Sequence, residues 1–219
     1  RNTFRFLLGN LNDIFKIIDL KKIDPSELPE LEQFMLHKLY SLDVNFKKYF
    51  KNYDFHNLYK ELLNFCTVDL SAFYFDIRKD TLYCDPIDSR KRQSTLLLLN
   101  ILLNSLLKWF APILSFTTEE IYRLLLKDNK SIHLEKFLDF PSIFDNQKLY
   151  EKWIQLIRIR NICNVSIEEK RASKEIGSSL EANLNIHLDQ KLEKITKNID
   201  FSELCITSKA EIFFKEKIE

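Results

Sequence analysis

The feature that most constrains the fold is an uncharged apolar stretch, "STLLLLNILLNSLL", which runs from Ser94 to Leu107. Apolar runs of about 10–14 residues form buried core helices more often than membrane spans, which need about 20 residues. Three polar side chains, Asn100, Asn104 and Ser105, also interrupt this run. The stretch therefore predicts a core helix, and no membrane partner is expected.

Further helices are indicated by apolar residues that recur every three or four positions. Only two of the 219 residues are glycine and 45% are hydrophobic, which favours a mainly helical soluble protein. Thr117 and Glu120 have the spacing of a capping box. The expected helices cover the opening stretch, about Pro29 to Lys51, Asp54 to the break at "DTLYCDP", Ser89 to "WFAP", and "SFTTEEIYRLLL".

The pattern changes after about residue 130. One more helix is expected from about Asn146 to Ala172, and the alternation in "IGSSLEANLNIHLD" predicts a half-buried strand. A helix over "QKLEKITKNI" and a short strand over "SELCITSKAEI" follow. The predicted fold is mainly α, with an antiparallel helical bundle over residues 1–138 and a small α/β subdomain over residues 139–219.

No catalytic constellation is visible. The chain has no glycine-rich phosphate loop, no G-x-S-x-G, no H-E-x-x-H and no C-x-x-C. The scattered candidates are His37, His56, His133, His187, Cys66, Cys84, Cys163 and Cys205. Glu119 and Glu120 are paired carboxylates, but their place in a first helical turn favours capping over acid–base chemistry. We therefore expect no catalytic site, metal or cofactor in this chain, and reduced cysteines in a cytoplasmic setting.

The opening phrase "RNTFRFLLGN" separates into two faces when it is wound as a helix at about 100° per residue. The apolar face holds Phe4, Leu7, Leu8 and Leu11, and the polar face holds Arg1, Asn2, Arg5, Gly9 and Asn12. Phe6 lies near the polar arc, either as a stacking residue or as a contact to another part of a larger protein. Trp109 and Trp153 lie on apolar stripes and are expected in the core.

The formal net charge of +1 gives no overall preference for nucleic acid, so such a partner requires a local basic patch. The basic clusters are Arg1 with Arg5, Arg78 with Lys79, Arg90 to Arg92, and residues 158–174. Arginine and lysine neutralise phosphates, and nearby aromatic faces can stack on unpaired bases. For each cluster, a charged face that is merely solvated is the alternative.

Several phrases resemble the anticodon-binding region of isoleucyl-tRNA synthetases. "RNTFRFLLGNLND" is similar to the phrase that opens that region, and "YDFHNLYKELLNFC", "FYFDIRKDTLYCD" and "WFAPILSFTTEEI" follow in the family's order. "RASKEIGSSLEA" resembles a later phrase of the family. Valyl and leucyl relatives share the bundle and remain alternatives, but the first and last phrases favour the isoleucyl family.

The resemblance implies a larger protein that uses ATP and magnesium to attach isoleucine to its tRNA. Its catalytic and editing domains would precede Arg1, so the chain is expected to be a piece of that protein. Whether the larger protein carries a C-terminal zinc unit stays open. The expected partner of this piece is the anticodon stem-loop of isoleucine tRNA, with no DNA partner and a monomeric state.

The residues expected to contact tRNA are Arg1, Asn2, Arg5, Gly9, Asn12, Arg78, Lys79 and Arg171. Arg1 and Arg5 lie one helical turn apart and could reach phosphates, although salt bridges to Asp13 or to a neighbouring helix are the alternative. Gly9 would let the RNA backbone approach, unless it marks tight helix packing. Asparagine supplies both a donor and an acceptor for base edges. The competing hypothesis is a helical protein-interaction scaffold that does not bind RNA.

Overall fold

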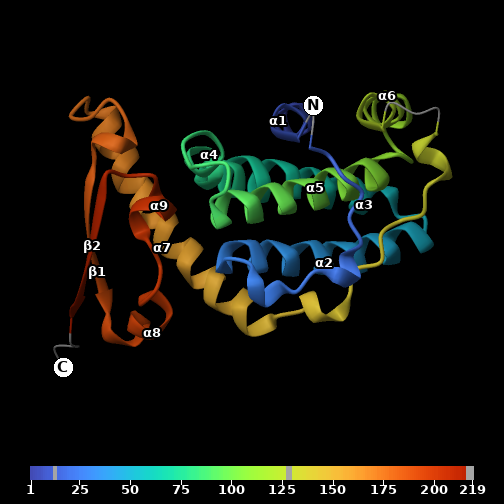
Figure 1. The fold of residues 1–219 in the computed structure, drawn as a ribbon. Coiled ribbons are helices and arrows are strands. Elements are labelled where there is room, and N and C mark those ends of the chain that lie inside the picture. Colours follow the sequence, from blue (N-terminus) through green and yellow to red (C-terminus); the bar gives the residue numbers. More distant parts are fainter. Residues whose placement is uncertain (12–13, 127–129, 216–219) are drawn as a thin grey trace. The chain divides into compact units, whose positions relative to one another are not determined.

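The structure is a computed structural model that describes residues 1–11, 14–126 and 130–215. It divides into two compact units, Arg1–Asn146 and Gln147–Glu219, each of which is described by itself. Figure 1 shows the first unit as a helical bundle and the second as a long helix with two strands. The mainly helical fold predicted from the sequence is confirmed.

The first unit contains six α-helices among its described residues. Their bounds are α1 (Asn2–Leu11), α2 (Glu30–Lys51), α3 (Phe55–Asn64), α4 (Phe75–Tyr83), α5 (Arg90–Phe110) and α6 (Ser115–Leu126). A π-helical segment, Phe65–Tyr74, joins α3 to α4, so the chain continues through these three elements without leaving a helical path.

Helix α5 is the centre of this bundle. It packs against α1, α2, α4 and α6, and every residue from Leu98 to Phe110 is buried. Asn100 and Ser105 in its apolar run are buried and hydrogen-bonded, as buried polar groups usually are. The Asn100 side chain accepts from the Lys16 backbone N–H at 2.9 Å and donates to the Leu96 carbonyl at 3.0 Å. The prediction of a core helix is confirmed.

A buried ion pair links α2 to α4. The Arg78 guanidinium donates from Nε and Nη2 to the two carboxylate oxygens of Glu32, both at 2.7 Å. The Tyr74 hydroxyl donates to the same carboxylate at 3.0 Å. Glu32 and Arg78 are 0% and 3% exposed, so these hydrogen bonds replace the water that both charges have lost.

Residues 139–146 belong to the first unit, eight residues beyond the boundary expected after residue 138. Their aromatic side chains supply the physical reason. Phe140 is buried against Trp109, with the ring centroids 6.0 Å apart. The Asn146 backbone N–H donates to His37 Nδ1 at 2.9 Å and so holds the end of the segment on α2.

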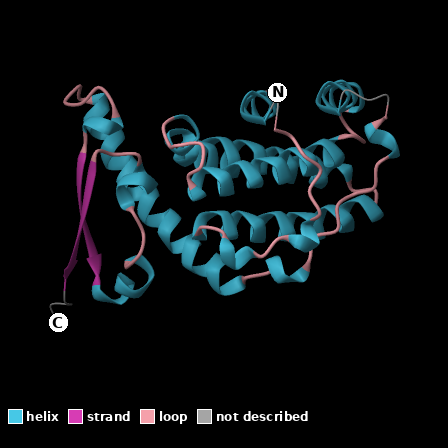
Figure 2. Ribbon diagram, in the orientation of Figure 1, coloured by secondary structure: helices cyan, strands magenta, loops and turns pink. Residues whose placement is uncertain are grey.

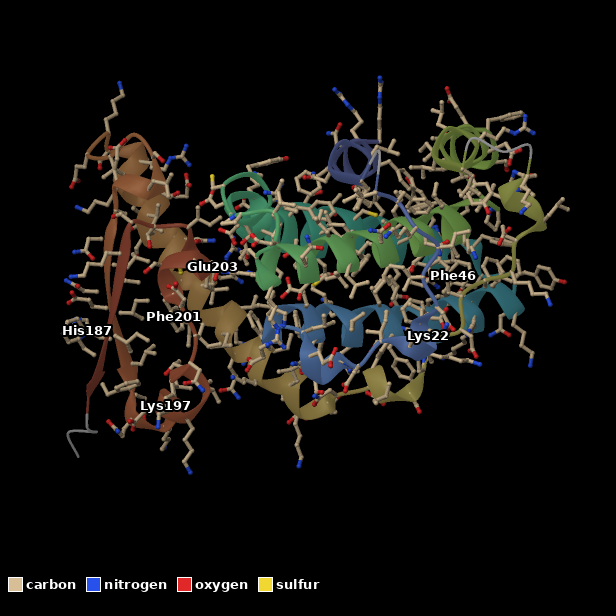
Figure 3. All side chains as sticks on the ribbon, viewed as in Figure 1. Lys22, Phe46, His187, Lys197, Phe201 and Glu203 are labelled. Atoms are coloured by element: carbon tan, nitrogen blue, oxygen red, sulfur yellow. The ribbon has the colours of Figure 1, made fainter. Side chains whose placement is uncertain are left out.

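Trp109 lies in an aromatic cluster of the bundle. Its ring centroid is 5.8 Å from that of Phe46 on α2, which is labelled in Figure 3. Trp109 is fully buried, and Trp153, in the second unit, is 4% exposed. The expectation that both tryptophans are core residues is confirmed.

Local capping signals predicted several helix ends correctly. Asp54 caps α3 by accepting from the Asn57 backbone N–H at 3.2 Å, and Ser89 caps α5. The capping box predicted for Thr117 and Glu120 is wrong, because α6 already begins at Ser115. Glu119 instead accepts from the Ile132 backbone N–H at 3.0 Å, so its carboxylate caps a short turn elsewhere in the unit.

The second unit combines α7 (Gln147–Ala172) with a parallel pair of strands, β1 (Asn183–Asp189) and β2 (Lys209–Lys215). Figure 2 shows both strands in this unit. Two short helices, α8 (Glu193–Thr196) and α9 (Phe201–Cys205), lie between the strands in the chain. Ile186 of β1 is opposite Ile212 of β2 in the register of the pair.

The expected strand over "SELCITSKAEI" is correct only in its later part. Asp200 accepts from the Ser202 and Glu203 backbone N–H groups at 2.9 and 3.2 Å, and this cap starts α9 where the sequence suggested a strand. Ile206 then ends α9 in the left-handed region, at φ 57°. Among the described residues, no helix is long and apolar enough to cross a membrane.

The buried ion pair generates a stability prediction. Arg78→Met should lower the free energy of unfolding by about 3–5 kcal/mol, because it leaves the Glu32 carboxylate buried without its partner. Urea unfolding followed by circular dichroism measures this change. Lys79→Met is the matched control on the same helix, since the exposed pair of Lys79 with Asp76 should contribute only about 0–1 kcal/mol. Equal losses in the two variants would contradict the prediction.

Candidate nucleic-acid interface

The first helix presents the two faces that its sequence predicts. Phe4, Leu7 and Leu11 are buried, and Arg1, Asn2, Arg5 and Gly9 are exposed. The Arg5 backbone N–H donates to the Arg1 carbonyl at 3.0 Å, which places these two residues one helical turn apart. The apolar residues therefore hold α1 on the bundle, while its cationic residues face solvent.

Arg1, which immediately precedes α1, and Arg5 within it have no ion-pair partner among the described residues. Asp13, one of the alternative partners considered for them, lies outside those ranges, as does the predicted contact residue Asn12. Within the described ranges, no carboxylate therefore competes with an anionic partner for these two charges.

Gly9 lies on the open side of α1. A Cβ atom at this position would have no atom within 4 Å, so tight helix packing is not the reason for glycine here. The surface at Gly9 can be approached closely by a ligand backbone.

Phe6 is not a free stacking residue. Its ring stacks on Phe75 of α4, with the centroids 4.2 Å apart and an interplanar angle of 18°. The contact lies within the first unit, so Phe6 helps to fix α1 against the start of α4.

The two cations of α4 differ in whether they are exposed and could contact RNA. Arg78, expected at the tRNA surface, is 3% exposed and committed to Glu32, so we no longer place it at the surface. Lys79 is exposed, but its Nζ lies 2.8 Å from Asp76 Oδ1. Arg78 and Lys79 are neighbours on a helix, so one points into the bundle and the other points to solvent. The family phrase did not show which of the two is buried.

Three arginines of the other basic clusters also form hydrogen bonds within the protein. Arg90 and Arg92 donate to the carbonyls of Glu27 and Asp85, each at 2.6 Å, and thereby brace loops. Arg160 is buried and donates to the Leu204 carbonyl at 2.8 Å. These three side chains serve the fold.

Arg171 lies in the last turn of α7, in the second unit. Its guanidinium is exposed and lies 2.6 Å from Glu168 Oε1. Lys174 follows in the left-handed region, at φ 61°. Arg171, Lys174 and Gly177 are among the residues that line a shallow groove of about 450 Å³.

A cavity that the sequence did not suggest opens beside the first turn of α1. It has a volume of about 410 Å³, and Arg1 and Asn2 contribute to its lining together with residues of α3, the π-helical segment and α5. Tyr59 of α3 and Leu114, which precedes α6, are also part of this lining. These residues are distant in the sequence, so no local motif could have identified the cavity.

The described residues include no group of three or more His, Cys, Asp or Glu side chains that could hold a metal ion. Cys66 lies in the cavity wall and is 7% exposed. Burial raises the pKa of its thiol to about 11. The thiol is therefore protonated near neutral pH, and Cys66 serves as an apolar wall residue rather than as a nucleophile.

The family assignment rests on α2 to α7 and the first strand rather than on α1. Residues 32–188 match the family described as "Anticodon-binding domain of tRNA ligase", and the chain belongs to that family.

Comparison with curated proteins makes the assignment more specific. The chain is 67% identical over 210 residues to the isoleucine–tRNA ligase of Pelagibacter ubique, covering 96% of the chain and 23% of that protein. It is 41% identical over 209 residues to the Agrobacterium fabrum isoleucine–tRNA ligase, covering 95% of the chain and 21% of the relative. The chain is thus an anticodon-binding region of the isoleucine–tRNA ligase family, and it spans less than a quarter of the length of these relatives.

The buried cysteine gives a prediction about labelling. At pH 8, N-ethylmaleimide should modify the exposed Cys84 and leave Cys66 largely unmodified, because the Cys66 thiol is buried and protonated. Labelling of Cys66 should accelerate as the pH rises toward 11, where its thiolate forms. Peptide mass spectrometry reads both sites. Equal rates at Cys66 and Cys84 at pH 8 would overturn the described packing around Cys66.

Proposed function

We propose that this chain binds the anticodon stem-loop of isoleucine tRNA and positions that tRNA for aminoacylation. The observation that carries the proposal is the exposed face of α1, where Arg1 and Arg5 have no carboxylate partner among the described residues. Membership in the anticodon-binding family supports tRNA as the polyanion. The two arginines would neutralise loop phosphates, and Asn2 would bond to a base edge.

The same proposal covers the larger ligase. Its catalytic part would use ATP and magnesium to join isoleucine to the tRNA, in the cytoplasm and as a monomer. This chain would contribute binding and orientation, since precise docking of one end of the tRNA helps to place the reacting end.

The proposed contact surface is narrower than the basic residues of the sequence suggest. Arg78 is excluded because it is buried, while Lys79 and Arg171 each have a nearby carboxylate. An exposed i,i+3 ion pair is weak and can be exchanged for a phosphate at small cost, so these two residues remain secondary contacts. Arg1, Asn2, Arg5 and Gly9 form the primary surface.

The alternative hypothesis, a helical protein-interaction scaffold that does not bind RNA, is supported by the ion pairs of Lys79 and Arg171. If Lys79, Arg171 and their neighbours are simply solvated ion pairs, the chain could bind a protein through its helices. It does not account for Arg1 and Arg5, which have no carboxylate partner among the described residues, and it predicts no dependence on the tRNA sequence. Binding to tRNA separates the two hypotheses.

The expected result is salt-dependent binding of the 219-residue chain to isoleucine tRNA, with weaker binding to a tRNA whose anticodon is changed. Arg5→Gln should reduce the slope of log affinity against log salt by about one if Arg5 contacts a phosphate. Fluorescence anisotropy titrations over a range of salt concentrations measure both quantities.

Lys79→Gln is the control for the loss of one exposed cation and should change the slope less than Arg5→Gln. Equal affinity for the two tRNAs, with no dependence on salt, would overturn the proposed function.

A further inference from the structure

Two buried thiols of the second unit lie against each other. Cys163 is in α7 and Cys205 is the last residue of α9, and these two helices pack together. Phe201 and Glu203, which are labelled in Figure 3, mark the position of α9. Cys163 is 7% exposed and Cys205 is 3% exposed. Both cysteines are free, and the Cys205 thiol donates a hydrogen bond to the Cys163 sulfur. The interface of α7 and α9 therefore contains a pair of nucleophilic side chains that the proposed function does not use.

A buried arginine holds the two cysteines in this position. Arg160 lies one helical turn before Cys163 in α7, and its Nε donates to the Leu204 carbonyl at 2.8 Å. Leu204 directly precedes Cys205, although it is 44 positions from Arg160 in the sequence. This hydrogen bond thus ties the backbone beside one thiol to the helix that carries the other thiol.

Cys66, in the first unit, is the reference for a buried thiol with no second thiol beside it. It is 7% exposed, as Cys163 is, and burial raises its pKa to about 11. At Cys163 the hydrogen bond from Cys205 outweighs burial and lowers the pKa. The pKa of Cys205 is raised, first by that hydrogen bond and then by burial. Because the thiolate is the form that attacks oxidants, Cys163 should react more readily than Cys66, and Cys205 is placed to react with the oxidised sulfur.

We propose that Cys163 and Cys205 form a redox-sensitive pair, which a hydroperoxide converts to a disulfide between α7 and α9. The Cys163 thiolate attacks hydrogen peroxide, the O–O bond breaks, and the leaving hydroxide takes up the proton that Cys163 released. The Cys205 sulfur then attacks the resulting sulfenic acid and displaces a second water molecule. In balance, two thiols and one hydrogen peroxide give one disulfide and two water molecules. A dithiol reductant restores both thiols by thiol–disulfide exchange.

The disulfide stabilises the second unit. It closes a loop of the chain that contains β1 and α8, since both elements lie between the two cysteines in the sequence. Helix α9 also packs against β2, so joining α9 to α7 secures the start of that strand. A cross-link that closes a long loop lowers the entropy of the unfolded chain, so the oxidised unit unfolds less often than the reduced one. Formation of the disulfide also keeps Cys163 from the irreversible sulfinic stage of oxidation.

Disulfide mapping of the 219-residue chain tests the pair directly. After treatment with hydrogen peroxide at neutral pH, peptide mass spectrometry should find Cys163 joined to Cys205, with the loss of two hydrogen atoms. Cys66 should remain a thiol, and dithiothreitol should reverse the cross-link. Cys84 is exposed, so a Cys84→Ser background prevents cross-links between molecules.

Two matched serine variants assign the roles within the pair. Cys205→Ser keeps a hydrogen-bond donor for Cys163 but cannot form the disulfide, so a sulfenic acid should accumulate at Cys163 and be trapped by dimedone. Cys163→Ser leaves the less acidic thiol alone, and Cys205 should then take up little dimedone. Circular dichroism checks that both variants are folded.

Hydrogen exchange measures the effect of the disulfide on the wild-type chain. Peptides from β1, α9 and β2 should exchange at least about tenfold more slowly after oxidation, because the cross-link disfavours opening of the second unit. Peptides from α2 and α5 of the first unit are the internal control and should be unchanged.

Three results would contradict the inference. Oxidation of Cys84 in the wild-type chain without a cross-link between Cys163 and Cys205 overturns the redox pair. Equal dimedone labelling of the two serine variants overturns the assignment of Cys163 as the attacking thiol. A disulfide that leaves hydrogen exchange in the second unit unchanged overturns its stabilising role. The salt titrations with tRNA test the proposed function separately.

Discussion

Burial of α5 is the constraint on which the first unit depends. A helix whose second half is buried on every side cannot be stable alone, and it requires α1, α2, α4 and α6 to cover it. Water is excluded from this centre, so each polar group there needs an internal partner. The amide of Asn100 meets that requirement by bonding to the backbone of Lys16 and of Leu96.

The same constraint sorts the cations into structural and functional groups. Arg78 faces the covered side of the bundle, where its charge is stabilised only because Glu32 and its hydrogen bonds are in place. Arg1 and Arg5 lie on the uncovered side of α1, where the bundle offers them no carboxylate among its described residues. The proposed binding surface consists of cations that form no ion pair within the described bundle.

Much of this arrangement could be predicted because its causes are local. The apolar spacing in α1 and α5, the Asp54 and Ser89 caps and the break at Pro112 act within a few residues of one another. The differences from expectation have two causes. Glu119 caps a turn more than ten residues away, which no local pattern shows. The Asp200 cap bonds to Ser202 and Glu203, and this local signal starts α9 within a stretch whose apolar spacing favoured a strand.

The candidate site shows the same division. The phrase "RNTFRFLLGN" predicted which residues of α1 face outward, because helical periodicity is a local property. It could not reveal that Tyr59 and Leu114 adjoin the first turn, since α3 and the corner before α6 approach it only in the folded bundle.

The sequence alone determined the family, the helical bundle and the two faces of α1, because phrases and periodicities are readable along one dimension. Only the tertiary structure decided that Arg78 is an internal counterion, that Phe6 stacks on Phe75, and that a cavity with no acidic residue in its described lining lies beside Arg1. Each of these depends on which helices pack together. Packing is set by the burial of the whole apolar surface rather than by any short segment.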